Sequence, residues 1–257
     1  MKQIMKPAIM AMAISFVFIA CNNEEKTDSS GKDSAQNKTT TTETQTQTQN
    51  LDAAKVAADR YSVVKDTMGI RVLSLNYKPG DSSAMHSHPD LVLYVVDGGK
   101  TEFTMKDGSK TTMDLPSGTA AIVGSTTHSV KNVGTTTVNG YLFEINRPNK
   151  AASTDNTMDA VKVDPKHYKL IQDSLNIRIV MADYKPGTSS PMHSHPDNVL
   201  YVISASKAEF TKKDGSKQVM QLDKGMIAIG PADTHSVKNV GNTNAKVLLV
   251  EVNRPQN

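Results

Sequence analysis

Residues 78–90 read KPGDSSAMHSHPD, and residues 185–197 read KPGTSSPMHSHPD. The two segments lie 107 positions apart, and the same offset extends far beyond them in both directions. Aligned without a gap, residues 61–149 and 168–256 are identical at 48 of 89 positions. Self-similarity at a fixed spacing is the sign of a repeated structural unit. The sequence therefore predicts two tandem domains that share one fold.

Each unit has the pattern of an all-β fold. In the first unit, short runs rich in Val, Ile, Leu and Thr occupy residues 70–77, 91–96, 101–105, 119–123 and 137–146. Turns that contain Gly or Pro separate these runs, which is typical of a sandwich or barrel. Four glycines should lie in such turns: Gly80, Gly118, Gly187 and Gly225. The helical expectation is limited to the Ala-rich segment 52–59, whose counterpart contains Pro165.

Six of the seven histidines repeat with the unit, whereas His167 has no counterpart. In a strand, residues two apart share one face and lie roughly 6.6 Å apart, so each His-Ser-His directs two imidazoles the same way. A third imidazole from a neighbouring strand would complete a metal site, although a polar strand edge is the alternative. We expect two ligand groups: His86, His88 and His128, and His193, His195 and His235.

These residues resemble the motifs of the cupin superfamily. Gly-x5-His-x-His is present at residues 80–88 and again at 187–195. The second cupin motif, Gly-x5-Pro followed by His-x3-Asn, is complete at residues 225–239, whereas Gly124 replaces the proline in the first unit. The resemblance covers about residues 60–256 and implies two double-stranded β-helix (jelly-roll) barrels, a bicupin.

The sequence departs from the usual cupin motif in its ligands. Positions 92–93 and 199–200 hold Val and Leu where a metal-binding Glu is usual. The three remaining imidazoles resemble those of three-His cupins of the thiol dioxygenase type. The resemblance implies a divalent ion such as Fe, Zn, Mn, Cu or Ni, with open coordination positions for water or substrate. Protons compete for imidazole, so occupancy should fall near pH ~6.5.

Other repeated polar residues are candidates for contact with a substrate or with the ligands: Asp90, Tyr94, Glu144, Asp197, Tyr201 and Glu251. The two aspartates follow a proline, so they could supply a carboxylate or stabilise a turn. The glutamates could stand behind the ligands or fix the last strand, and the tyrosines could form core or pocket wall. Arg71 and Arg178 lie in the middle of expected strands, where they could meet an anionic substrate or face outward.

The chain begins with a basic stretch and an apolar run that ends at Ala20, directly before the lone cysteine, Cys21. The run has the length of a secretory h-region and is short for a spanning helix. Ala20-Cys21 resembles a bacterial lipobox, which implies a lipidated Cys21 and a protein anchored in the cell envelope, facing the periplasm or the surface. An ordinary signal peptide is the alternative. One cysteine also excludes a disulfide within the chain and a Cys-rich metal cluster.

The predicted organisation is a signal peptide at 1–20, a disordered tether at 21–50, cupin domains at 51–149 and 158–257, and a linker at 150–157. The tether is rich in Thr and Gln and has no large apolar residue, so it cannot form a core. Without residues 1–20 the chain has 27 Lys plus Arg against 26 Asp plus Glu. This near-neutral balance argues against nucleic-acid binding.

The leading functional hypothesis is a metal-binding bicupin lipoprotein that acts on or binds a small molecule. An enzyme of this kind would be a metal-dependent oxygenase or isomerase. The alternative is a non-catalytic cupin module that binds a sugar or a signal, and a third possibility is a structural envelope protein in which the imidazoles stabilise the barrels. We also expect the two barrels to pack on each other, because the linker between them is short.

Overall fold

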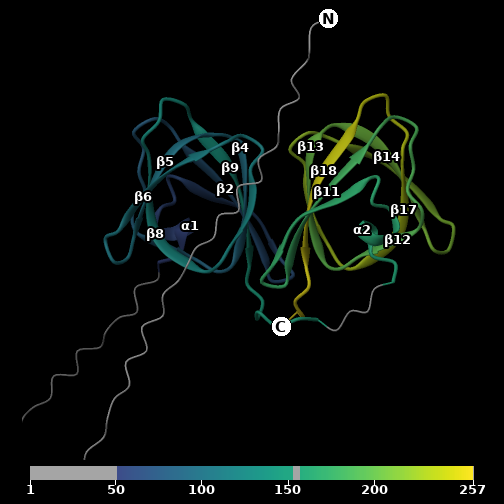
Figure 1. Cartoon of the computed structure of the whole chain (residues 1–257), viewed down its shortest axis with the longest axis horizontal. Coiled ribbons are helices and arrows are strands. Elements are labelled where there is room, and N and C mark those ends of the chain that lie inside the picture. The colour runs from purple at the N-terminus through teal and green to yellow at the C-terminus, as the bar shows by residue number, and fades with distance from the viewer. Residues whose placement is uncertain (1–50, 153–156, 257) are drawn as a thin grey trace, which may run out of the picture. The chain divides into compact units, whose positions relative to one another are not determined.

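The computed structural model describes residues 51–152 and 157–256, which belong to one compact unit (Figure 1). The predicted signal peptide at 1–20 and the whole predicted tether at 21–50, with Cys21, lie outside the described residues. Nearly all of the regular secondary structure in the described chain is strand, which confirms the all-β prediction. None of its helices is long and apolar enough to cross a membrane.

The two halves contain the same elements in the same order. The first half consists of α1 (Ala53–Val56), β1 (Tyr61–Thr67), β2 (Ile70–Tyr77), β3 (His86–His88), β4 (Leu91–Asp97), β5 (Gly99–Met105), β6 (Lys110–Leu115), β7 (Ala120–Val123), β8 (Thr126–Asn132) and β9 (Val138–Ile145). The second half consists of α2 (Ala160–Val163), β10 (Tyr168–Ser174), β11 (Ile177–Tyr184), β12 (His193–His195), β13 (Asn198–Ser204), β14 (Ser206–Lys212), β15 (Lys217–Leu222), β16 (Ile227–Gly230), β17 (Asp233–Asn239) and β18 (Ala245–Val252).

Each half is a pair of antiparallel sheets. In the first half, a five-stranded sheet has the order β1-β2-β9-β4-β7 and a four-stranded sheet has the order β3-β8-β5-β6. The second half repeats both orders with β10 to β18. Apolar side chains fill the interior of each pair, and Leu73, Tyr77 and Leu142 are among those of the first half. The histidine-bearing strands β3 and β12 both lie at the edge of a four-stranded sheet.

Glycines occupy the predicted turns between strands. Gly80 and Gly118 have φ values of 84° and 81°, and their counterparts Gly187 and Gly225 have 77° and 83°. Residues with a side chain rarely adopt this left-handed conformation, so glycine is the natural choice at these positions.

The two short helices begin at matching aspartates. Asp52 accepts a hydrogen bond from Ala54 N at 3.0 Å, and Asp159 accepts one from Val161 N at 3.1 Å. Each carboxylate thereby satisfies a backbone donor of the first turn. The helix of the first half is shorter than the expected segment 52–59, and the second half also forms one because Pro165 lies after its end.

An apolar core also joins the halves. The five-stranded sheets contribute buried residues from both halves to one cluster, which contains Ile70, Val72, Val92, Tyr94, Phe143, Ile145, Ile177, Ile179, Val199, Tyr201, Leu248, Val250 and Val252. These sheets are therefore buried on both faces, which explains their nearly continuous apolar strands. The barrels thus pack on each other, as expected.

Candidate metal centres

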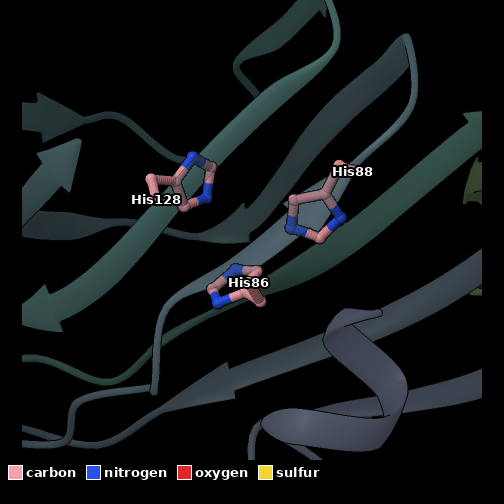
Figure 2. Close-up of side chains that lie close together, drawn as sticks. All are labelled: His86, His88 and His128. Atoms are coloured by element: carbon pink, nitrogen blue, oxygen red, sulfur yellow. The ribbon is translucent and has the colours of Figure 1, made fainter. Parts of the chain in front are cut away.

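The first group of three histidines gathers at the junction of β3 and β8. His86 and His88 are buried on β3, and His128 stands directly opposite His86 in the β3–β8 register. Each residue offers one nitrogen that lies within 4.8 Å of the other two. The ring centroids are 4.8 Å (His86–His88), 4.9 Å (His86–His128) and 5.5 Å (His88–His128) apart. Figure 2 shows the three rings gathered around a common space.

The second half repeats this geometry. His193 stands opposite His235 in the β12–β17 register, and His195 completes the group, again with one nitrogen of each within 4.8 Å. The ring separations are 4.9 Å, 4.9 Å and 5.5 Å. The six histidines selected from strand parity and motif spacing therefore lie in two groups of three.

The Nδ1 atoms of the two β3 histidines have acceptors that fix the tautomer. His86 Nδ1 donates to the carbonyl of Ala84 at 2.7 Å, and His88 Nδ1 donates to Glu144 Oε1 at 2.7 Å. A neutral imidazole that donates through Nδ1 carries its lone pair on Nε2. In the second half, the corresponding distances are 2.9 Å from His193 to Pro191 and 2.7 Å from His195 to Glu251.

A charged chain runs behind each carboxylate. Glu144 is fully buried and accepts a hydrogen bond from Arg71 Nε at 2.6 Å, and Arg71 in turn pairs with Asp52 at 2.8 Å. The Arg71 guanidinium also lowers the pKa of Asp52. The matching Arg178 pairs with Asp159 and lies 3.4 Å from Glu251. Each arginine therefore lies behind the glutamate that bonds to a histidine of the site. This position is neither the contact with an anionic substrate nor the outward-facing position that the sequence offered.

The free nitrogens of the first group fit a metal ion. His86 Nε2 and His88 Nε2 are buried and have no hydrogen-bond partner among residues 51–152 and 157–256. A buried polar atom without a partner is energetically costly, and a divalent cation would satisfy both at once. Three imidazoles without a carboxylate ligand form a donor set that suits Zn, Cu, Fe or Ni.

Two tyrosines that the sequence did not single out line these sites. The ring centroid of Tyr61 lies 5.0 Å from that of His86, and the centroid of Tyr168 lies 4.8 Å from that of His193. The Tyr168 hydroxyl donates a hydrogen bond to His193 Nε2 at 2.9 Å, whereas the Tyr61 hydroxyl lies 3.0 Å from the Tyr77 hydroxyl. The available signal was their identity between the two units.

Burial favours the neutral form of four of the imidazoles. Desolvation lowers the pKa of His86 to about 4 and that of His128 to about 3. In the second half, it lowers the pKa of His193 to about 4 and also lowers that of His235. The lone pairs needed for a metal are therefore present at neutral pH. Protons should therefore compete with a metal ion for these nitrogens at a pH below the ~6.5 expected for unperturbed histidine.

The remaining candidates have other neighbours. Asp90 accepts hydrogen bonds from Ser125 N at 2.8 Å and from Arg254 Nη2 at 2.6 Å, which links the two halves. Asp197 accepts hydrogen bonds from Ala232 N at 2.8 Å and Arg147 Nη1 at 2.9 Å. Each carboxylate therefore stabilises a turn and also links the two halves.

Tyr94 and Tyr201 pack against each other with ring centroids 4.9 Å apart, within the core between the halves. The unmatched histidine, His167, is buried, bonded to Asp164 and stacked on Tyr184. These three side chains therefore belong to the packing of the molecule, and none of them belongs to either histidine group.

Two hollows open beside the second histidine group. One of about 430 Å³ is lined largely by apolar side chains, among them Leu200, Phe210 and Met220, and reaches His235. The other, of about 970 Å³, reaches His195. A small molecule in either hollow would therefore meet a histidine of the group.

The comparisons with known proteins agree with this architecture. A family model described as a cupin domain matches residues 180–251. Among curated proteins, none matches the chain.

Many solved structures are similar in fold. AerE from Microcystis aeruginosa is 18% identical, with a TM-score of 0.53, over 75% of this chain and 91% of that chain. An oxalate decarboxylase variant from Bacillus subtilis is 15% identical, with a TM-score of 0.54, over 76% and 72%. A 7S globulin from Momordica charantia is 11% identical, with a TM-score of 0.52, over 77% and 83%. At these identities, the likeness establishes the fold alone.

Proposed function

We propose that this chain is a tandem pair of cupin barrels that binds a divalent metal ion in each barrel and acts on a small molecule there. The observation that carries the proposal is the state of the nitrogens in the first group. Two buried Nε2 atoms lack a partner, while the Nδ1 atom of each ring is held by an acceptor.

The residues that would hold the ion are His86, His88 and His128 in the first barrel and His193, His195 and His235 in the second. Glu144 and Glu251 would orient one ligand each and raise its basicity through Nδ1. A bound divalent ion would supply Lewis acidity and positions for exchangeable ligands. One solved structure of similar fold, the Bacillus subtilis oxalate decarboxylase, is described with Mn(II) centers, which supports the class of cofactor.

Two functions remain for such a centre. A metal-dependent oxygenase or isomerase would use the ion in catalysis, whereas a non-catalytic module would use the barrel to hold a sugar or a signal. The open approach to His235, whose side chain is 14% exposed, favours the enzyme, because a reacting molecule needs access to the ion. If the metal-free protein binds a small-molecule ligand as well as the metal-loaded protein does, that result would favour the non-catalytic module.

Elemental analysis of protein purified without a histidine tag tests the metal proposal. The wild type should retain about one ion per barrel, and replacing both His88 and His195 with Ala should abolish stoichiometric metal. The control is His167→Ala, which removes a buried histidine outside the two groups and should leave the metal content unchanged. A double variant with the full metal content would overturn the proposal.

We further propose that the protein is a lipoprotein of the bacterial cell envelope, anchored through Cys21. The support is the sequence, in which a basic start and an apolar run lead to Ala20 and the lone cysteine. Cys21→Ser should release the protein from membranes and leave its β-sheet circular dichroism unchanged. If that variant still sediments with membranes after a high-salt wash, the protein is held by another route.

A further inference from the structure

We propose that the C-terminal barrel binds a small organic anion with an apolar body, and that Lys212 recognises its negative charge. The inference deepens the proposed function, since it names the ligand class of the same barrel. It arises from the places where the two halves differ, although their histidine groups are the same.

Strand register places Lys212 beside the histidine group. Lys212 on β14 stands directly opposite His235 on β17, and Asp233 on β17 stands directly opposite His195 on β12. Directly opposed residues of antiparallel strands project to the same face, with Cβ atoms roughly 4.5–5.5 Å apart. Phe210, two residues before Lys212, shares that face, and its ring centroid lies 5.4 Å from that of His235. A cation and an aromatic ring therefore flank a candidate metal ligand.

The hollow of about 430 Å³ next to Lys212 is suited to an apolar group. Leu200, Met220 and Met226 line it together with Phe210, and His235 lies at its wall. Its volume is within the range of small-molecule sites. Lys212 also lines the larger hollow that reaches His195, so this residue borders both hollows, as Asp233 does.

Within the described residues, Lys212 is not held in an ion pair, although the carboxylates of Asp233 and Asp214 lie close enough to interact with its charge. Its side chain is exposed and forms no ion pair within 4.0 Å in the part of the chain that the structure describes. The adjacent Asp233 is engaged elsewhere, because its Oδ2 lies 3.3 Å from His235 Nδ1 and its Oδ1 accepts from Thr234 N at 2.8 Å. Asp214, at the turn that follows, accepts a hydrogen bond from Ser216 N at 2.8 Å.

The N-terminal barrel provides an internal comparison. Met105 stands opposite His128 where the second barrel has Lys212, so the cation is replaced by a thioether. Val123 replaces Gly230, and a Cβ built on Gly230 would meet nothing within 4 Å. The second barrel is therefore more open beside its histidines, and it gains there both the cation of Lys212 and the carboxylate of Asp233, which replaces Thr126 and lies 3.3 Å from His235 Nδ1. Its ligand should carry a negative charge, which the first barrel has no equivalent side chain to pair with.

Matched probes that differ in charge alone test this inference. The full chain, with and without added metal, is titrated with acetate, hexanoate and phenylacetate and with the corresponding neutral amides, and binding is followed by protein NMR. We expect phenylacetate and hexanoate to bind more tightly than their amides and to shift resonances of residues around Phe210. Lys212→Met, which installs the residue of the other barrel, should weaken binding of the anions by roughly tenfold and leave the amides unaffected.

The control is Lys207→Met, which removes the same charge from the same strand at an exposed position of opposite parity that lines neither hollow. It should bind the probes as the wild type does. Equal binding of acids and amides, binding of neither class up to tens of millimolar, or an unchanged Lys212→Met titration would overturn the inference. Metal analysis of the same samples separates the two proposals. Protein that retains metal but does not prefer anions refutes only the inference about Lys212. Protein that lacks metal but prefers anions through Lys212 refutes only the metal centre.

Discussion

At the scale of single residues, the two centres differ in what holds the third histidine. His128 Nδ1 lies 3.4 Å from the hydroxyl of Thr126, and His235 Nδ1 lies 3.3 Å from a carboxylate oxygen of Asp233. A carboxylate on the far nitrogen makes an imidazole a more basic ligand than a hydroxyl does. The second centre therefore has two carboxylate-supported imidazoles, on His195 and His235, and the first has one.

This difference predicts unequal affinities for metal. Asp233→Thr should weaken metal binding in the C-terminal barrel by roughly tenfold, and Thr126→Asp should strengthen it in the N-terminal barrel. Each change is measured by chelator competition in a chain whose other centre has been removed by His88→Ala or His195→Ala. Equal affinities before and after both substitutions would show that these neighbours do not tune the ligands.

The buried imidazoles also predict how the metal-free protein responds to acid. Burial lowers the pKa of His86 and of His193 from 6.5 to about 4, so the unfolded chain binds more protons than the folded one between those pH values. The stabilising contribution is fully present above pH ~6.5 and is lost as the pH falls towards 4. The Tm of metal-free protein should fall across this window, with a shallower slope in a chain that carries His86→Gln and His193→Gln. Parallel slopes would assign the acid sensitivity to other groups.

At the scale of elements, the sequence predicted the strands that are rich in β-branched and aliphatic residues. The run at 70–77 coincides with β2, the run at 91–96 is one residue shorter than β4 at its end, and the run at 137–146 exceeds β9 by one residue at each end. These strands lie between two apolar layers, so their composition alone identifies them. The histidine groups were predictable for a related reason, since parity within a strand fixes which side chains share a face.

The strands that the sequence analysis missed have no such signature. β1 is an edge strand whose Val63 and Val64 are exposed, and β6 is largely exposed, with the polar sequence KTTMDL. Each pairs with its neighbour in the chain, β1 with β2 and β6 with β5, but an exposed polar strand lacks the apolar composition that identifies the others. The link from Asp52 through Arg71 to Glu144 also required the structure, since it joins a helix cap to two strands that are far apart in the sequence.

That link predicts a specific loss of stability. Arg71→Met should reduce the free energy of unfolding by about 3–5 kcal/mol, because it leaves the fully buried Glu144 without its cation. Denaturant unfolding of the metal-free protein measures the change. Lys65→Met on the exposed edge strand is the control and should alter stability by less than about 0.5 kcal/mol. A loss as small as that of the control would mean that His88 alone compensates Glu144.

At the scale of the whole molecule, the halves are joined by an apolar core with a polar rim. Arg147 pairs with Asp197 of the second half at 2.9 Å, and Arg254 pairs with Asp90 of the first half at 2.6 Å. The tyrosine pair Tyr94–Tyr201 lies in the apolar part. Each five-stranded sheet therefore depends on the other half to cover its outer face.

An isolated half should consequently fail as a soluble monomer. Residues 51–149 expressed alone would expose the sheet face that carries Val92 and Phe143, and large exposed apolar patches promote association. We expect this fragment to elute as oligomers or aggregates in size-exclusion chromatography, whereas residues 51–257 remain soluble under the same conditions. A fragment that elutes as a folded monomer would show that the interface contributes little.

The crossed arginines have one more consequence. Arg147 Nη1 donates to the carbonyl of Arg254 at 3.0 Å, and Arg254 Nη1 donates to the carbonyl of Arg147 at 3.1 Å. Such reciprocity is the geometry of an isologous homodimer with a two-fold axis, here formed within one polypeptide. In a true homodimer every mutation appears on both sides of the axis. Fusion removes that restriction, so one barrel can keep Met105 while the other acquires Lys212, and a symmetric pair can evolve two different specificities.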